Sequence, residues 1–148
     1  MPQQPASSPE HGYCQVEHQA NIIRISVAEG INKELILRYQ QEIARELTAL
    51  GGGHWGVHLV INGDVLMTPE ATERLILETS RHVALGRCGT AIELVNGRAT
   101  SLIQRFWGQL YQQAGIPYCF VSNRQEAEVW LKQQIAAADS RRTGCSPE

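Results

Sequence analysis

Several sequence patterns that carry chemistry are missing from this chain. Its 148 residues contain no P-loop, no G-x-S-x-G nucleophile elbow and no G-x-G-x-x-G between a strand and a helix. The four cysteines are scattered without a C-x-x-C pair, so neither a disulfide framework nor a zinc site is indicated. We therefore expect a protein that is not an enzyme, with no catalytic residue, no metal and no cofactor.

An excess of charge of one sign and long apolar runs are also missing. The net charge is -2 at pH 7 and the sequence pI is near 6.2, whereas nucleic-acid binding usually requires a clustered basic face. The longest apolar runs are far shorter than the roughly 20 residues that cross a bilayer. The opening residues lack the basic region and apolar core of a secretion signal. We expect a cytoplasmic protein with no membrane span and no nucleic-acid partner.

The length and composition fit one globular domain. A chain of 148 residues with 43% hydrophobic content can bury a core without disulfides or metals. Residues 1–12 are rich in Pro, Ser and Gln and are predicted to be a disordered tail. Residues 13–138 are predicted to form the domain, and the polar residues 139–148 a second disordered tail.

The order of apolar patterns predicts an α/β fold. A strand hairpin at about 13–18 and 21–26 is followed by an amphipathic helix that ends at Gly51. Repeated strand–helix units imply right-handed crossovers, so we expect a mixed, mainly parallel sheet of about five strands with four helices. The later strands are predicted near 57–61, 89–95 and 118–121, and the later helices near 69–85, 100–114 and 123–138.

A polar loop joins a buried strand to a capped helix start in the middle of the chain. The strand ends at Asn62-Gly63, a turn dipeptide. Thr68 directly precedes Pro69, which is preorganised for the first helical position, so Thr68 is the predicted N-cap. Its hydroxyl lies at the end of the helix dipole that favours negative charge, where an anion or phosphoryl group can be held.

Polar residues also follow the other parallel strands at their carboxyl ends. Ligands of open parallel sheets usually bind at this edge. We therefore expect three loops to meet beside Thr68. They are Asn62-Gly63-Asp64, Asn96-Gly97-Arg98 and Ser122-Asn123-Arg124.

Three short motifs accompany this order of elements and carry a family resemblance. They are Glu29-Gly30-Ile31-Asn32, Met67-Thr68-Pro69-Glu70-Ala71 and Glu126-Ala127-Glu128-Val129-Trp130-Leu131. Over about residues 22–135 the chain resembles the STAS domain of anti-sigma-factor antagonists and sulfate transporters, which has the SpoIIAA-like fold. It is most similar to a stand-alone bacterial branch, called STAS-like or SpoIIAA-like, whose members are largely uncharacterised.

The resemblance implies a regulatory role for Thr68. In antagonist members of the family, a serine or threonine at the start of the second helix is phosphorylated by a partner kinase, which controls binding to a protein partner. Thr68 is the matching position, although Met67 and Pro69 flank it where the family usually has Asp before and a Ser-Gly-Leu-like continuation after. The alternative is that Thr68 is only an N-cap.

Two functions follow from these patterns. The first is a non-catalytic, regulatory protein-interaction module that docks a partner through Asp64, Val65, Leu66, Met67 and Thr68. A homodimer is also compatible with the sequence, because the hairpin leaves a sheet edge to cover.

The alternative function is a small-ligand carrier at the carboxyl ends of the strands. In this hypothesis Arg98, beside Asn96, and Arg124 neutralise the head group of an anionic or amphipathic molecule, while Leu66 and Met67 supply apolar contact.

Overall fold

The computed structural model describes residues 14–29 and 33–144, which form one five-stranded sheet and four helices. The predicted α/β class and order of elements are confirmed, while the predicted tail at residues 1–12 lies outside the described residues. In chain order the elements are β1 (Cys14–Gln19), β2 (Ile22–Ala28), α1 (Lys33–Leu50), β3 (Trp55–Asn62), α2 (Pro69–Ala84), β4 (Arg87–Val95), α3 (Thr100–Ala114), β5 (Tyr118–Val121) and α4 (Arg124–Gly144).

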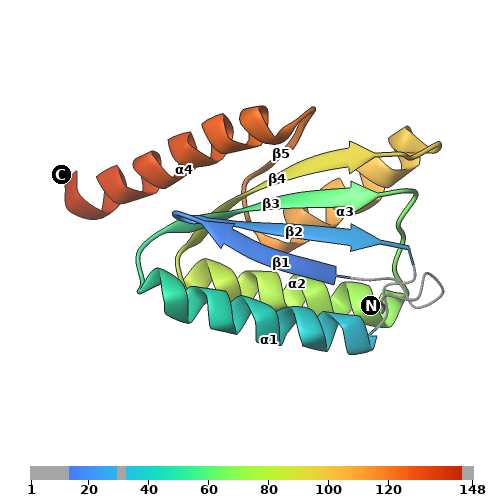
Figure 1. The fold of residues 1–148 in the computed structure, drawn as a ribbon, viewed down its shortest axis with the longest axis horizontal. Helices are drawn as coiled ribbons and strands as arrows, with labels where there is room; N and C mark the ends of the chain where they lie inside the picture. The colour runs from blue at the N-terminus through green and yellow to red at the C-terminus, as the bar shows by residue number, and fades with distance from the viewer. Residues whose placement is uncertain (1–13, 30–32, 145–148) are drawn as a thin grey trace, which may run out of the picture.

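The strands follow one another across the sheet in the order β1-β2-β3-β4-β5. The hairpin pair β1 and β2 is antiparallel, and the remaining neighbours are parallel. Figure 1 shows α4 on one side of the sheet and α1 and α2 on the other. Side chains of α3 join those of α1 and α2 in one core, so three helices share one face and α4 lies on the opposite face.

The two faces bury different amounts of apolar surface. Alternate residues of β2 and β3, such as Ile25 and Leu59, point into the large core under α1, α2 and α3. The opposite face has a small core in which Ile22 and Ala91 meet Leu131 of α4. Because α4 packs mainly over β3 and β4, the side chains of β1, and those of β2 beyond Ile22, lie beside the helix on this face and not beneath it.

Side chains cap the starts of α2 and α4, and the cap of α2 is the predicted one. Thr68 is the N-cap of α2, and its Oγ1 accepts a hydrogen bond from the Ala71 N–H at 3.1 Å. At the start of α4, Asn123 Oδ1 accepts from the Glu126 N–H at 2.9 Å. Glu126 in turn reaches back to accept from the Ser122 N–H at 2.8 Å. The bonds from the Ala71 and Glu126 N–H groups satisfy backbone donors that the first turn of a helix leaves free, and the bond from the Ser122 N–H fixes the residue before the cap of α4.

Helix α4 is longer than predicted. It continues through residues 139–144, so their assignment to a disordered tail is wrong. The preceding residues 136–138 are alanines, which favour the helix, and Ala138 is buried. Asp139 Oδ1 then lies 2.7 Å from His54 Nδ1, which ties this part of the helix to the start of β3. Residues 145–148 lie outside the described part of the chain.

A buried arginine organises a polar cluster within the large core. Arg87 is 1% exposed. Its Nη1 donates to the Tyr39 hydroxyl at 3.3 Å and lies 3.3 Å from His82 Nδ1. Its Nη2 donates to Thr90 Oγ1 at 2.8 Å. Burial and then the charge of Arg87 lower the pKa of His82 to about 3. His82 is therefore neutral in the fold, and its Nδ1 accepts from Arg87.

This cluster predicts that stability falls in mild acid. An unfolded chain protonates His82 below pH 6.5, whereas the folded chain does so only near pH 3. Between those values the unfolded state binds the extra proton, so lowering the pH from 7 to 5 should cost about 2 kcal/mol of unfolding free energy from this group. Urea unfolding at several pH values measures the slope. We expect His82→Asn to reduce this slope, and an unchanged slope in His82→Asn would contradict this account.

Candidate functional site

The loops that follow β3 and β4 lie against each other at the carboxyl edge of the sheet. Asn96 Nδ2 donates to Asn62 Oδ1 at 3.0 Å, and the Gly63 N–H donates to the Val95 carbonyl at 2.8 Å. Asn96 has a φ of 58°, a left-handed conformation that asparagine tolerates better than most residues. The structure thus brings two of the three predicted loops together.

The Asp64 carboxylate fastens these loops to the start of α3. Its Oδ1 accepts from the Arg98 N–H at 2.8 Å and from the Ala99 N–H at 3.0 Å. Ala99, at the N-cap of α3, cannot cap the helix with its own side chain. Asp64, from another loop, therefore supplies the oxygen that accepts from these backbone N–H groups. Gly97 permits the approach, because a Cβ at that position would lie 2.9 Å from Asp64 Oδ1.

The chain between Asp64 and α2 alternates between the core and the surface. Val65 is fully buried, and its carbonyl accepts from Trp107 Nε1 at 3.0 Å. Met67 is also buried, whereas Leu66 between them is 46% exposed. Thr68 is exposed as it caps α2. Of the predicted docking residues, Val65 and Met67 therefore act as anchors in the core and cannot themselves contact a partner.

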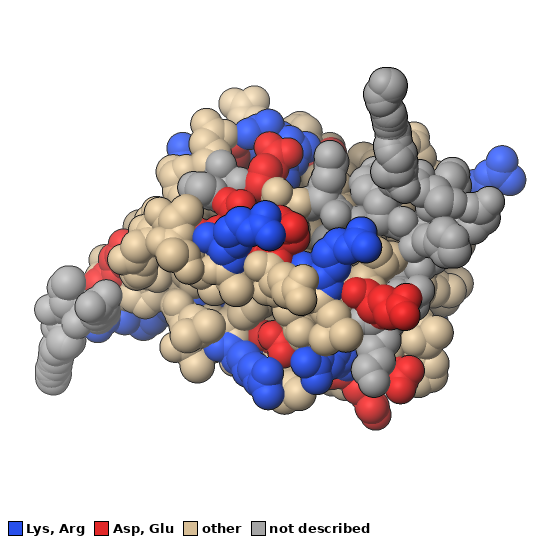
Figure 2. Space-filling view, turned by 60° about the horizontal axis from the view of Figure 1, so that its bottom comes forward, with Lys and Arg blue, Asp and Glu red and all other residues tan. Residues whose placement is uncertain are grey.

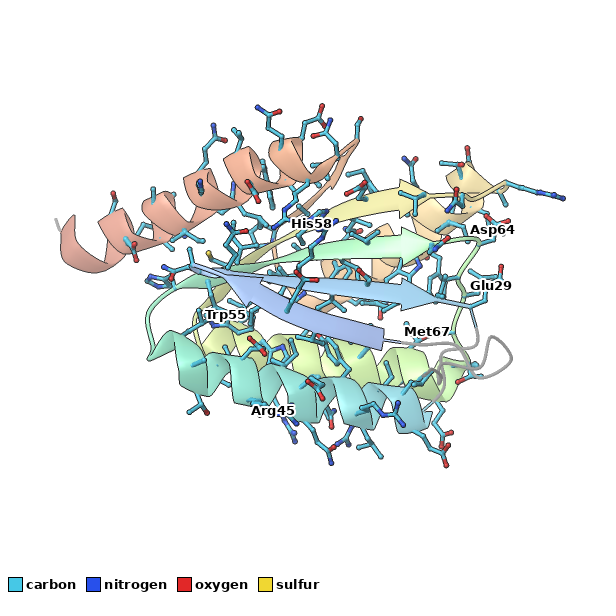
Figure 3. The ribbon with its side chains drawn as sticks, viewed as in Figure 1. Glu29, Arg45, Trp55, His58, Asp64 and Met67 are labelled. Atoms are coloured by element: carbon cyan, nitrogen blue, oxygen red, sulfur yellow. The ribbon has the colours of Figure 1, made fainter. Side chains whose placement is uncertain are left out.

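Acidic side chains gather near this helix start. Figure 3 shows Glu29 and Asp64 at the same edge of the sheet, and the Glu29 carboxylate packs against Gly63. Glu70 lies in the first turn of α2. These carboxylates offset the positive end of the α2 dipole, so the surroundings of Thr68 are less favourable to a free anion than the sequence suggests.

The structure places Arg124 on the opposite face of the sheet from α3, which Arg98 precedes. Arg98 lies in the exposed loop before α3, whereas Arg124 begins α4 on the other face. The Nη2 of Arg124 donates to Gln19 Oε1 at 2.7 Å, and its Nε donates to Glu128 Oε2 at 3.1 Å. The predicted head-group site that joins Arg98 with Arg124 is therefore wrong, because the chain after β5 turns to the opposite face from the chain after β4.

A second site, which the sequence interpretation missed, lies between the β1–β2 hairpin and α4. We call it the hairpin groove, an open cavity of about 80 Å³. Figure 3 shows His58, which lies in it, well away from Asp64 and Glu29. The groove is lined by Glu17, Gln19 and Ala20 of the hairpin, by Ile22, Arg24 and His58 of the sheet, and by Arg124, Glu128 and Lys132 of α4.

His58 is the most buried polar residue of the hairpin groove. It is 1% exposed, and its Nε2 lies 2.8 Å from Glu93 Oε1. Burial lowers the pKa of His58, and this effect outweighs the opposing hydrogen bond and charge of Glu93. The ring is therefore neutral near pH 7, and Nε2 carries the proton that it donates to Glu93.

Arg24 lies next to His58 and is incompletely paired. The two residues are register partners on β2 and β3, and Glu17 is opposite Arg24 on β1. The Nε of Arg24 is shielded from solvent without a hydrogen-bond partner among the described residues. An unsatisfied buried donor costs about 1–3 kcal/mol. One sequence signal marks this face: Arg24 and Ser26 interrupt the apolar residues of β2 at every second position, as on a sheet face that no helix covers.

The cysteines described in full offer no activated nucleophile. Cys88 and Cys119 are free and partly buried beside α4, as the scattered spacing predicts. Burial raises the pKa of both thiols, that of Cys119 to about 11, so both are protonated near pH 7. Among the described residues, no cluster of His, Cys, Asp and Glu is suited to a metal ion.

The face formed by α1 and α2 carries mixed charge. Figure 2, which brings the lower side of Figure 1 forward, shows Lys and Arg among Asp and Glu over its described part. Arg45 pairs with Glu42 at 3.3 Å, and Arg81 pairs with Glu78 at 2.9 Å. Within residues 14–29 and 33–144, no helix has the length and apolar character required to cross a membrane.

Comparison with known proteins shows the fold. No family model and no curated protein match the chain. Its structure is similar to that of an uncharacterised protein of the DUF3478 family from Shewanella loihica PV-4, which has a SpoIIAA-like fold. The TM-score is 0.55 and the identity 11%, over 86% of this chain and 99% of the other. The expected SpoIIAA-like fold is thus confirmed.

The Asp64 contacts predict a structural role that can be measured. Asp64→Ala removes the acceptor of two backbone N–H groups, and we expect a loss of about 1–3 kcal/mol in unfolding free energy. Asp64→Asn keeps an oxygen at the same position and should lose less. Urea unfolding of the two variants checks this expectation, and equal losses would show that the charge of Asp64 matters and not its geometry.

Proposed function

We propose that this chain is a non-catalytic, regulatory protein-interaction module. It docks a protein partner through the loop between β3 and α2 and through the start of α2. The observation that carries the proposal is the position of Leu66, a 46% exposed leucine held between two buried anchors, Val65 and Met67. The SpoIIAA-like fold of the structural neighbour supports a module of the STAS type.

The loop presents Leu66 on a rigid support. The Asp64 carboxylate, the bond from Trp107 to the Val65 carbonyl and the Thr68 cap each fix one part of the loop. A partner that covers Leu66 removes its remaining apolar surface from water, worth about 1 kcal/mol, without first having to order the loop. The exposed Thr68 and Arg98 supply polar groups at the rim of such a contact.

Phosphorylation of Thr68 would regulate this surface by charge. Its hydroxyl oxygen accepts from the Ala71 N–H, and the residue is exposed to an incoming kinase. A phosphate adds about -1.5 to -2 charges, which the N-terminus of α2 favours and the carboxylates of Glu29 and Glu70 oppose. The added charge beside Leu66 would change which partner surfaces fit.

The docking proposal predicts a defect specific to Leu66. Leu66→Asp places a charge at the centre of the contact, and we expect partner binding to fall by at least about tenfold while the fold is retained. Leu77→Asp is the matched control, because Leu77 is also 46% exposed but lies within α2. Tagged variants purified from the native host, with co-purifying proteins quantified by mass spectrometry, give the comparison. Identical protein sets for the two variants would contradict docking at Leu66.

The regulatory part of the proposal has its own test. We expect the chain purified from its own organism to carry one phosphate that survives denaturation and maps to Thr68. The phosphorylated fraction should differ between the partner-bound and free pools, as read from intact mass spectra. Chains that are unmodified in both pools would assign Thr68 to capping alone and leave the docking surface as a constitutive one.

A further inference from the structure

We infer that the hairpin groove is a binding site for a small organic anion, a carboxylate or a phosphate ester, held by Arg24 and Lys132. The site lies apart from the surface around Leu66, and the inference does not rest on the docking proposal. The groove exists because α4 packs mainly over β3 and β4 and lies beside the hairpin without covering it.

The size of the groove suits a small molecule. Its volume of about 80 Å³ is several times the roughly 10–15 Å³ that one water requires. Its base includes the apolar Ile22 and the buried His58. Every fourth residue along α4, namely Arg124, Glu128 and Lys132, faces the groove, so one helical stripe forms its wall.

The charges that remain unpaired in the groove favour an anion. Arg124 is already paired with Glu128 and bonded to Gln19, and these contacts fix the helix wall to the hairpin. Arg24 and Lys132 make no ion pair among the described residues, and in the lining they face one carboxylate without an ion pair, that of Glu17. The Glu93 carboxylate, outside the lining, is bonded to His58. A guanidinium in such a partly dry site pairs well with the two oxygens of a carboxylate or phosphate.

His58 adds a hydrogen-bond acceptor to the site. Because Nε2 donates to Glu93, the neutral ring presents a lone pair on Nδ1, which has no partner among the described residues. A ligand hydroxyl can donate to this nitrogen while Arg24 holds its anionic group. The site therefore selects anions that also carry a hydroxyl group.

Titration of the full chain with defined anions tests the site. The probes are inorganic phosphate, glycolate and acetate, added to ¹⁵N-labelled protein at constant ionic strength. NMR follows the amides of Arg24 and Glu17 and the ring nitrogens of His58. We expect the chemical shifts of these nuclei to change and then saturate with inorganic phosphate or with glycolate. The anion that produces saturation shows whether the site binds a phosphate or a carboxylate. Acetate, which lacks the hydroxyl, should bind more weakly than glycolate; equal binding would overturn the role of His58.

Removing a positive charge and removing a negative charge from the groove should change anion binding in opposite directions, which makes the test specific. Arg24→Gln should weaken binding by about tenfold or more, because it removes the bidentate donor. Lys132→Gln should weaken binding and Glu17→Gln should strengthen it, and both residues are exposed enough to leave the fold intact. Arg38→Gln and Glu34→Gln change the same charges on exposed positions of α1 and should have no effect.

Two results would overturn the inference. One is a shift that grows linearly with anion concentration without saturating. The other is an equal loss in Arg24→Gln and Arg38→Gln, which would indicate a general charge effect. Leu66→Asp should leave anion binding unchanged, so the failure of this site and the failure of the docking surface are distinguishable.

Discussion

The rest of this structure depends on one constraint: helices must cover both faces of the parallel strands. Each face of the sheet needs helices, and here three of them share one face while α4 alone lies on the other. A helix is about 10 Å across and strands are about 4.8 Å apart, so one helix covers about two strands. Helix α4 covers mainly β3 and β4, and the hairpin side of this face remains open. The polar residues of β2 and the hairpin groove both follow from this shortage of helices.

The sequence was sufficient to predict the fold because its local signals agree with one another. The bounds of α3 and β5 match the predicted residues, since Gly115 and Pro117 punctuate the chain between them. Thr68 caps α2 as predicted, with its hydroxyl bonded to the Ala71 N–H. The end of α4 was missed because residues 139–144 are polar, and polar composition alone does not separate a tail from an exposed helix that contacts the fold only on one side.

The candidate site was less predictable because side-chain direction decides it. Spacing identified the loop from Asp64 to Thr68, but it could not reveal that Val65 and Met67 turn inward. Nor could it reveal that Asp64 accepts hydrogen bonds from the two backbone N–H groups just before α3. Arg124 was misplaced for a similar reason: the strand ends lie on one edge, but a chain can leave that edge toward either face. The pairing of His58 with Glu93 could not be read from the sequence, because the two residues are 35 positions apart.

The position of α4 as the last described element also bears on how the chain folds during synthesis. A ribosome completes β1 through β5 before it adds α4, so the face that holds Ile22 and Ala91 has no cover until this helix emerges. The bond from Arg124 to Gln19 joins positions 105 residues apart and can form only at that stage. The nascent chain therefore exposes apolar sheet surface late in translation, when chaperone capture competes with docking of the final helix.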